Sequence, residues 1–437
     1  MTMINAYTAG GSDRLSAEDE ALIARRVSAL GPAYRLFYQT PVHFVRGEGV
    51  WLFDPEGNAY LDVYNNVASV GHCHPHVVAA LARQAGILNT HTRYLNEIVV
   101  AYAERLLARF PDELANIMFT CTGSEANDLA IRIVKAFTGG TGFIVTEDAY
   151  HGVTEAVAAL SPSLGPLVDL GVHVRTVPAP VQAGADGAEI GEVFARGVRA
   201  AIADLQRHGI KPAALLVDTI FSSDGVYADP AGFLAPAVEA IRDCGGLFIA
   251  DEVQAGFGRT GEAMWGFVRH GLVPDLVTMG KPMGNGHPMA GVVLKPEIAE
   301  RFGRKSRYFN TFGGNPVSCA VGMAVLDVIE QEALRENALA VGLRLREGLN
   351  SLAKTHPTLG EVRGAGLFVG VDIQAGDRGA DPADLAARIV NDLRERRVLI
   401  SATGPGANVL KIRPPLVFSA QNADLFLERL DASLSAL

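Results

Sequence analysis

Three strand-like runs of the sequence end in residues whose types could perform chemistry. The run Ile117–Thr120 passes through a small-residue turn, Cys121 to Asn127, into a helix. Asp251 follows the apolar run Leu247–Ala250, and Lys281 comes shortly after another apolar run. Parallel strands point their carboxyl ends to one edge of a sheet, where α/β proteins bind ligands. We therefore expect these three features to meet in one site.

The turn before the helix suits an anion. Its residues are small enough for a ligand to approach closely, and the first N–H groups of a helix have no partner within the helix. Such helix N-termini bind phosphate more often than any other group. Taken alone, the segment is equally compatible with a turn in which Ser124 simply caps the helix.

Asp251 and Lys281 indicate a ligand of a particular kind. Asp251 suits a ring with a protonated nitrogen, and Lys281 suits a group with which it can form an imine. A carboxylate at the end of a buried strand is costly without a cation, although a metal or a hydrated strand end would also serve. Facing a ring N–H⁺ it would gain on the order of 4 kcal/mol at an effective dielectric of ~20. That gain would raise the pKa of the ring nitrogen by roughly three units. The chain has seven lysines, and Lys281 alone ends a buried strand beside a glycine. Desolvation lowers the pKa of such an amine and lets it form an imine.

A helix N-terminus for phosphate, a strand-end aspartate and a strand-end lysine are together the three attachments of pyridoxal phosphate. The segment 251–261 (DEVQAGFGRTG), Lys281 and the segment 310–320 (NTFGGNPVSCA) resemble the signature of class III, fold-type I aminotransferases. The similarity extends from about residue 36 to residue 418. It implies that Lys281 and Asp251 are the catalytic pair, Lys281 as the Schiff-base lysine and Asp251 on the pyridine nitrogen. As further cofactor contacts it implies Gly123, Ser124, Tyr150, His151, Val253, Gln254 and Thr311.

The resemblance also assigns roles to these contacts. Gly123 and Ser124 would hold the phosphate, Val253 would pack behind the ring and Tyr150 would stack on it. Gln254 would bind the phenolic oxygen. Once free of the cofactor, the Lys281 amine would carry the proton between substrate and cofactor carbons. Thr311 would reach the phosphate of the neighbouring subunit, so the resemblance implies a homodimer.

Three further segments indicate a branch of this family. Residues 37–78, 89–97 and 284–292 are most similar to type-two alanine–glyoxylate aminotransferases and to the phospho-lyases of phosphoethanolamine and phosphohydroxylysine. We expect an aminotransferase that moves an amino group from an amino acid or amine to a 2-oxo acid. The alternative is a phospho-lyase that releases ammonia and phosphate from a phosphorylated amino alcohol or hydroxylysine. Fold and cofactor cannot decide between them because both reactions share them.

Four residues bear on the substrate. Arg413, in KIRPP, stands where the class commonly binds a substrate carboxylate, and a guanidinium binds one bidentately. Because phosphoethanolamine lyases tend to have lysine there, Arg413 favours a carboxylate, although a surface arginine is the plain alternative. Asp218 stands where many ω-aminotransferases have a glutamate that pairs with this arginine, and its shorter side chain leaves that pairing open. Tyr38 is expected in the pocket, and Arg93 is the candidate cation for the phosphate of a lyase substrate.

Two other functions are less favoured alternatives. A decarboxylase, racemase or epimerase could use the same scaffold. The GHCHPH segment, with His72, His74 and His76, could belong to a metal- or effector-binding module without enzymatic activity. Three histidines within five residues cannot all reach one ion without an unusual backbone, so we expect no metal.

The elements that must position these residues form an α/β pattern. Seven short apolar runs alternate with helical stretches, which is typical of a mostly parallel sheet buried on both faces. They are Ile117–Thr120, Phe143–Thr146, Val172–Thr176, Ala214–Asp218, Leu247–Ala250, Leu276–Met279 and Gly291–Leu294. We expect the fold-type I architecture, in which a large domain (residues 76–316) carries the seven-stranded sheet. The two chain ends, 1–75 and 317–437, would form a small α+β domain.

The ends of the chain show weaker patterns. A helix over 17–30 should stop at Gly31-Pro32, and a hairpin should pair 42–45 with 50–53 before a strand at 59–63. After residue 316 we expect one long helical region to about residue 352. Further strands are expected at 362–373, 398–401 and 409–412.

Composition sets outer limits. The 437 residues carry a net charge of −10 at a pI near 5.6, which argues against a nucleic-acid partner because such binding needs a basic face. No run of 18 apolar residues exists, so we expect no membrane span. The N-terminus is polar and acidic, unlike a secretory signal. Four scattered cysteines fit a reducing compartment, so we expect a cytoplasmic protein.

Overall fold

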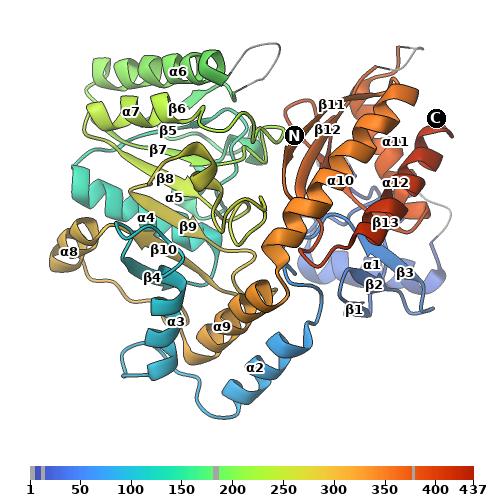
Figure 1. Ribbon diagram of the computed structural model, residues 1–437, viewed down its shortest axis with the longest axis horizontal. Coiled ribbons are helices and arrows are strands. Elements are labelled where there is room, and N and C mark those ends of the chain that lie inside the picture. Colours follow the sequence, from blue (N-terminus) through green and yellow to red (C-terminus); the bar gives the residue numbers. More distant parts are fainter. Residues whose placement is uncertain (1–4, 11–14, 181–186, 376–378) are drawn as a thin grey trace.

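A seven-stranded sheet dominates one lobe of the molecule (Figure 1). The computed structural model describes residues 5–10, 15–180, 187–375 and 379–437. The strand order is β4-β10-β9-β8-β7-β5-β6, and only β10 runs antiparallel to its neighbours. The predicted mostly parallel sheet is therefore confirmed. The strand predicted at 172–176 begins two residues later, as β6. The bounds are β4 Asn116–Thr120, β5 Gly142–Thr146, β6 Val174–Val177, β7 Pro212–Asp218, β8 Leu247–Asp251, β9 Leu276–Met279 and β10 Ala290–Leu294.

Both faces of this sheet are buried, as the continuous apolar runs require. Alternate residues of β7 join two different hydrophobic clusters, Leu215 and Val217 on one face, Ala214 and Leu216 on the other. Helices α6 and α7 contribute to the first cluster, while α4 and α8 contribute to the second. The helices of this lobe are α2 Pro75–Ala85, α3 Glu97–Leu107, α4 Gly123–Thr138, α5 Glu155–Ala158, α6 Gly187–Arg207, α7 Ala235–Asp243, α8 Pro296–Lys305 and α9 Pro316–Gln331.

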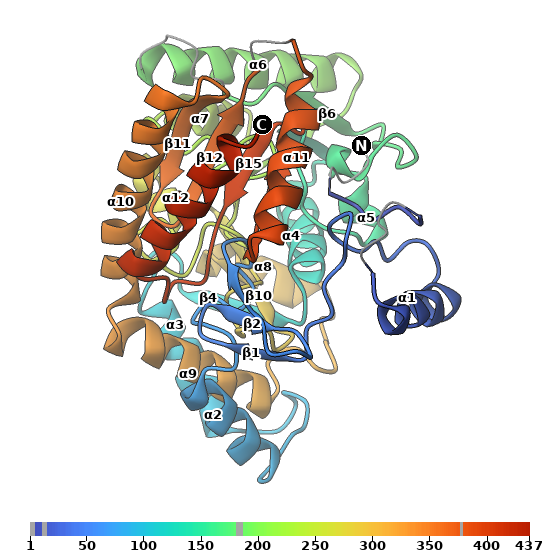
Figure 2. The ribbon, with the colours of Figure 1, turned by 90° about the vertical axis from the view of Figure 1, so that its right-hand side faces the viewer.

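The second lobe joins the two ends of the chain, as expected (Figure 2). Strand β13 of the C-terminal part pairs in parallel with β3 of the N-terminal part, so neither end forms this sheet alone. One sheet contains β1 Arg46–Glu48, β2 Trp51–Phe53, β3 Ala59–Asp62 and β13 Val398–Leu399. The other contains β11 Leu359–Ala365, β12 Phe368–Ile373, β14 Ser401–Thr403 and β15 Val409–Ile412. Helices α10 Leu334–Thr355, α11 Pro382–Glu395 and α12 Ala420–Leu434 cover them.

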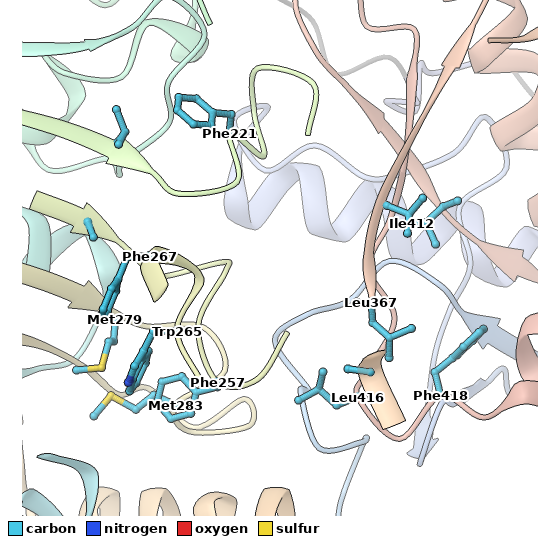
Figure 3. Close-up of a cluster of buried hydrophobic side chains, with 14 of the residues drawn as sticks. Phe221, Phe257, Trp265, Phe267, Met279, Met283, Leu367, Ile412, Leu416 and Phe418 are labelled. Carbon is cyan, nitrogen blue, oxygen red and sulfur yellow. The ribbon is translucent and has the colours of Figure 1, made fainter. Parts of the chain in front are cut away.

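One apolar cluster joins the lobes (Figure 3). Trp265 stacks on Phe110 with ring centroids 4.1 Å apart, and its indole N–H donates to the Arg109 carbonyl. Phe257 contacts Trp265 edge-on, and the same cluster includes Phe418 of the C-terminal part. The cluster contains buried side chains from both lobes, so its burial stabilises their association.

The predicted element boundaries are wrong at three turns, and at each of them one residue with a positive φ decides where the turn lies. The hairpin strand predicted at 42–45 lies at β1, because Gly49 adopts a φ of +59° and places the turn after Glu48. The predicted strand 362–373 is two strands, separated at Gly366 (φ +52°). The predicted helical region after 316 is broken at Ala333 (φ +50°) into α9 and α10.

The first helix is confirmed, and a membrane span is not found. Helix α1 covers Ala17–Leu30, with the Ser16 hydroxyl accepting from the Asp19 amide at its start and Gly31 (φ +70°) at its end. None of the helices in the described residues combines the length and the apolar character that crossing a bilayer requires.

Candidate functional site

Three polar residues lie side by side at the carboxyl edge of the large sheet. Asp218 ends β7, Asp251 ends β8, and Thr278 lies at the same level of β9. Lys281 follows three residues after Thr278. The register of the sheet therefore brings together residues that lie on separate strands and are about 30 positions apart in the sequence.

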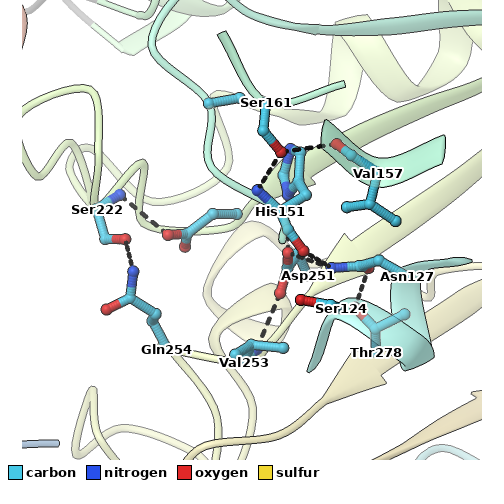
Figure 4. Close-up of polar contacts among 12 residues, drawn as sticks. Ser124, Asn127, His151, Val157, Ser161, Ser222, Asp251, Val253, Gln254 and Thr278 are labelled. Atoms are coloured by element: carbon cyan, nitrogen blue, oxygen red, sulfur yellow. Dashed lines mark hydrogen bonds and ion pairs between the residues drawn. The ribbon is translucent and has the colours of Figure 1, made fainter. Parts of the chain in front are cut away.

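Asp251 is buried and lies within hydrogen-bonding distance of three neighbouring residues (Figure 4). Its Oδ2 lies 2.7 Å from His151 Nδ1 and accepts from Asn127 Nδ2 at 2.9 Å. Its Oδ1 accepts from the Val253 amide at 3.1 Å. Asn127 is fixed in turn by Thr278, whose hydroxyl donates to its carbonyl oxygen at 2.8 Å. This network orients one fixed carboxylate at the sheet edge.

The start of α4 forms a cradle of the kind that binds phosphate. Thr122 caps the helix by accepting from the Glu125 amide, so the Gly123 and Ser124 amides precede the first intrahelical bonds. Ser124 Oγ accepts from the Val153 amide at 3.1 Å. A Cβ on Gly152, whose φ is +144°, would lie 2.5 Å from Ser124 Oγ. The backbone at Gly152 therefore lies close to Ser124, which only a glycine permits.

Lys281 lies between these groups and a second cavity. It is mostly buried, and burial, reinforced by the charge of Arg413, lowers the pKa of its amine. Its Nζ lies 5.9 Å from the centroid of the Tyr150 ring. An amine with a lowered pKa is more often unprotonated near neutral pH, as a nucleophile or proton acceptor must be.

Most residues predicted to bind the cofactor line one cavity. Within the described residues its wall carries two carboxylates, one amine, one imidazole and the glycine-rich cradle. It is lined by Gly123, Ser124, Tyr150, His151, Gly152, Asp218, Asp251, Val253, Gln254 and Lys281.

A neighbouring cavity of about 360 Å³ shares Lys281 with the first. One part of its wall is apolar, and another carries Arg413, Asp62 and two asparagines. Tyr38 belongs to this wall with a φ of +69°, and its hydroxyl donates to the Ile400 carbonyl at 3.1 Å. The wall consists of Leu36, Phe37, Tyr38, Pro41, Val42, Phe44, Leu52, Asp62, Tyr64, Asn65, Asn66, Val67, Lys281, Leu399 and Arg413.

Arg413 is the cation of the second cavity, and its side chain is 7% exposed. Its Nη1 donates to Asn66 Oδ1 at 2.8 Å and also to Gln254 Oε1. The guanidinium lies 4.3 Å above the centroid of the Tyr64 ring. Its buried Nε has no hydrogen-bond partner among the described residues.

Asp218 does not pair with Arg413. Its two oxygens accept from the Ile220 and Ser222 amides, each at 3.1 Å. Burial, together with the nearby charge of Asp251, raises the pKa of Asp218. Asp218 therefore belongs to the first cavity, beside Asp251.

Two predicted residues lie outside both cavities. Arg93 is exposed, with its guanidinium 3.7 Å from the centroid of the Phe309 ring. Thr311 is exposed in the loop that Asn310 closes by accepting from the Gly313 amide at 2.8 Å. Neither residue is brought to the chemistry within this chain.

The three histidines of GHCHPH contact three different carboxylates. His72 lies 2.7 Å from Asp62, His74 lies 3.0 Å from Glu332, and His76 lies 2.8 Å from Asp327. Within the described ranges of the chain, no group of three or more His, Cys, Asp or Glu side chains is placed to hold a metal ion. The histidines thus join this loop to α9 and to the wall of the second cavity.

Sequence reasoning missed several polar residues here. Asn127 could have been predicted, since it lies one helical turn after Ser124 and therefore faces the same edge of the sheet. Asn66 and Tyr64 gave none, because they follow β3 far from every other site residue in sequence. Lys411 is also buried, and burial together with Arg413 lowers its pKa well below the ordinary value.

The first cavity fits pyridoxal phosphate on the residues present. The cradle at α4 offers unpaired amides to a phosphate, the buried carboxylate of Asp251 needs a cation, and Lys281 supplies a desolvated amine. The second cavity offers an arginine to an anionic substrate. Because Lys281 lines both cavities, it can act on a molecule bound across them.

Comparisons with known proteins agree with this geometry. Residues 36–434 match the family model described as aminotransferase class III. A Drosophila melanogaster protein named alanine–glyoxylate aminotransferase 2-like is 41% identical over 420 residues, covering 93% of this chain and 85% of that protein.

Two solved structures are similar throughout. A phospholyase from Arthrobacter in complex with phosphoethanolamine is 46% identical with a TM-score of 0.91, covering 95% of this chain and 100% of that one. An amine transaminase from an uncultivated Pseudomonas species, in its pyridoxal-phosphate-bound form, is 28% identical with a TM-score of 0.83, covering 91% and 95%.

Proposed function

The chain belongs to the class III aminotransferase family, and from its site we propose that it transfers an amino group from an amino acid or amine to a 2-oxo acid. The family brings the cofactor, pyridoxal phosphate. The observation that carries the proposal is that Lys281 lies between the cofactor cavity and a cavity whose cation is Arg413.

We propose these cofactor contacts. The amides of Gly123 and Ser124 bind the phosphate, and Asp251, oriented by His151, pairs with the pyridine nitrogen. Lys281 would hold the cofactor through its desolvated amine. Val253, which packs on Gly123, supports one face of the ring, while Tyr150 covers the other. Gln254, in the wall of the same cavity, would contact the phenolic oxygen.

The chemistry divides between cofactor and protein. The bound cofactor supplies an electron sink for the pair left when the α-proton departs. Asp251 keeps the ring nitrogen protonated, because its buried charge stabilises a cation. The Lys281 amine takes the proton and returns it at another carbon, for which burial has lowered its pKa. Arg413 orients the substrate by its anionic group.

A phospho-lyase is the second candidate, favoured by the Arthrobacter enzyme at 46% identity. Arg413 could bind a phosphate as well as a carboxylate. A doubly charged phosphate, however, calls for a second cation, and Arg93, the predicted one, lies outside the cavity. One free guanidinium matches the single charge of a carboxylate better.

We propose that the enzyme is a homodimer in which Thr311 of each subunit reaches the phosphate bound by the other. The exposure of Thr311, together with the exposed Phe312 beside it, supports this proposal. A cytoplasmic location, and the absence of nucleic-acid and membrane partners, remain predictions from composition.

A single-turnover experiment tests the proposal. The holoenzyme is mixed with amines, amino acids or phosphorylated amino alcohols in the absence of any oxo acid. Lasting loss of the cofactor's visible band with stoichiometric pyridoxamine phosphate is expected from at least one donor. A band that recovers while ammonia and phosphate accumulate would establish the lyase instead.

A further inference from the structure

The guanidinium of Arg413 is held by neutral groups alone. Its hydrogen bonds to described residues leave from Nη1 and end on the amide oxygens of Asn66 and Gln254. The face of the guanidinium lies on the Tyr64 ring. None of these three partners carries a charge that could balance the arginine.

Asn66 is the centre of this arrangement. It is 2% exposed and donates from Nδ2 to Gln254 Oε1 at 3.3 Å while accepting from Arg413. Gln254 is tied in turn to Ser222, donating to its hydroxyl at 2.6 Å. The arginine is thus fixed from two sides, by the segment after β3 and by the loop after β8.

The nearby carboxylates are already engaged. Asp62, in the wall of the same cavity, accepts from the Tyr64 and Asn65 amides and contacts His72. Asp218 accepts from two backbone amides. In the part of the chain that the structure describes, no carboxylate lies within ion-pair distance of Arg413.

A buried guanidinium without a counter-ion favours anionic ligands. Arginine cannot shed its proton near neutral pH, so the charge persists in every step. A neutral ligand that fills the cavity would remove water from the arginine and leave it unpaired, which is strongly unfavourable. An anionic ligand relieves the same charge and forms charge-assisted hydrogen bonds.

We propose that Asn66 is a positioning residue that, with Tyr64 and Gln254, fixes Arg413 as an uncompensated anion receptor, so that both substrates of this site must carry an anionic group. The inference rests on the proposed function and narrows it, because amines without a carboxylate or phosphate become poor donors. A carboxylate at position 66 would supply the missing counter-ion and abolish the preference.

The test compares matched donors on the holoenzyme. Single-turnover rates are measured for an α-amino acid, for the amine that lacks its carboxylate and for a phosphorylated amino alcohol. The variants are Asn66→Asp, Asn66→Ala and, as the charge control, Asn96→Asp, which lies outside both cavities and can keep accepting from the Ile98 amide. Pyridoxamine phosphate, ammonia and phosphate are all quantified, so transamination and lyase turnover are recorded separately.

The wild type should prefer an anionic donor over the neutral amine by about 10³-fold or more, since a site built for a polar group rejects analogues that lack it. Asn66→Asp should reduce this preference by about 100-fold, chiefly by raising the KM of the anionic donor. Asn66→Ala should raise the same KM with kcat largely retained. Asn96→Asp should keep the preference within about 3-fold, because its charge lies outside both cavities and is screened by solvent.

Two outcomes would overturn the inference. Equal rates for the neutral amine and the amino acid on the wild type would show that the arginine selects nothing. If Asn66→Asp lowered the rates with the anionic donor and with the neutral amine equally, Asn66 would have only a structural role. A preference carried by phosphorylated donors with phosphate release would support the receptor while refuting the aminotransferase, so the two proposals fail separately.

Discussion

The two cavities that meet at Lys281 are assembled in opposite ways. The cofactor cavity is lined by residues 123 to 281, which follow strands of one sheet and are aligned by its register. The substrate cavity joins residues 36–67 to Leu399 and Arg413, through the contact between the two ends of the chain. The first is a property of one sheet edge, while the second exists only when the two ends of the chain pair with each other.

This difference assigns the reaction to the cofactor cavity and the choice of substrate to the substrate cavity. The groups on the sheet edge have short, rigid connections to buried strands, which suits groups that must hold a reacting ring in place. The substrate wall is built from loops and from strands β2, β3 and β13 of a different sheet, so it can vary without disturbing the cofactor. Substitutions in the two cavities should therefore produce different kinetic signatures.

The largest effect is expected at the shared residue. Lys281→Ala should lower turnover by about 10⁴-fold or more, because the amine both attaches the cofactor and transfers the proton. Steady-state kcat at saturating cofactor and substrate measures it. Lys295→Ala is the matched control, since Lys295 also follows a strand but pairs with Asp275 away from both cavities. If Lys281→Ala kept wild-type turnover, the two cavities would not meet functionally at this residue.

A change confined to the cofactor cavity should lower kcat. Asp251→Asn keeps the shape of the side chain and removes the charge that holds the ring nitrogen protonated, a contribution of roughly three pKa units. We expect kcat to fall about 10³-fold while the KM for the amino donor changes less than about 3-fold. A mainly raised KM would place Asp251 on the substrate side and break the comparison.

A change confined to the substrate cavity should do the reverse. Arg413→Gln removes a charge-assisted contact of about 1.5–3 kcal/mol, so kcat/KM for an anionic donor should fall about 10- to 100-fold. The absorption spectrum of the bound cofactor should stay unchanged, and this is recorded on the same samples. A perturbed spectrum would mean that Arg413 acts mainly on the cofactor.

The smallest effect on catalysis is expected at His270, behind the cofactor cavity. Its Nε2 donates to the Thr219 carbonyl at 3.0 Å, and burial lowers its pKa from 6.5 to about 4. Below pH 6.5 the unfolded chain gains a proton that the folded chain refuses until about pH 4. The contribution of His270 to the free energy of unfolding should therefore fall by about 1.4 kcal/mol per pH unit across this window.

Urea unfolding at several pH values measures this effect. The free energy of unfolding of the wild type, minus that of His270→Gln, should fall between pH 6.5 and 4, with little change in kcat at neutral pH. The same pH dependence in both proteins would contradict the assignment.

The same contrast explains how much could be predicted from the sequence. The seven large-sheet strands were identifiable because burial on both faces leaves continuous apolar runs, and Asp251 and Lys281 stood out as polar residues ending such runs. Asn66 and Tyr64 could not be predicted, since the contact with Arg413 depends on a pairing between β3 and β13 that spans more than 300 residues. The turns at Gly49, Gly366 and Ala333 were missed because a single positive φ decides each of them.

The most direct test of the central claim is to locate the cofactor on the chain. The holoenzyme is reduced with borohydride, digested, and its peptides are analysed by mass spectrometry. The account predicts the pyridoxyl group on Lys281 alone among the seven lysines of the chain. Label on any other lysine, or bound cofactor that leaves every lysine unlabelled, would contradict it.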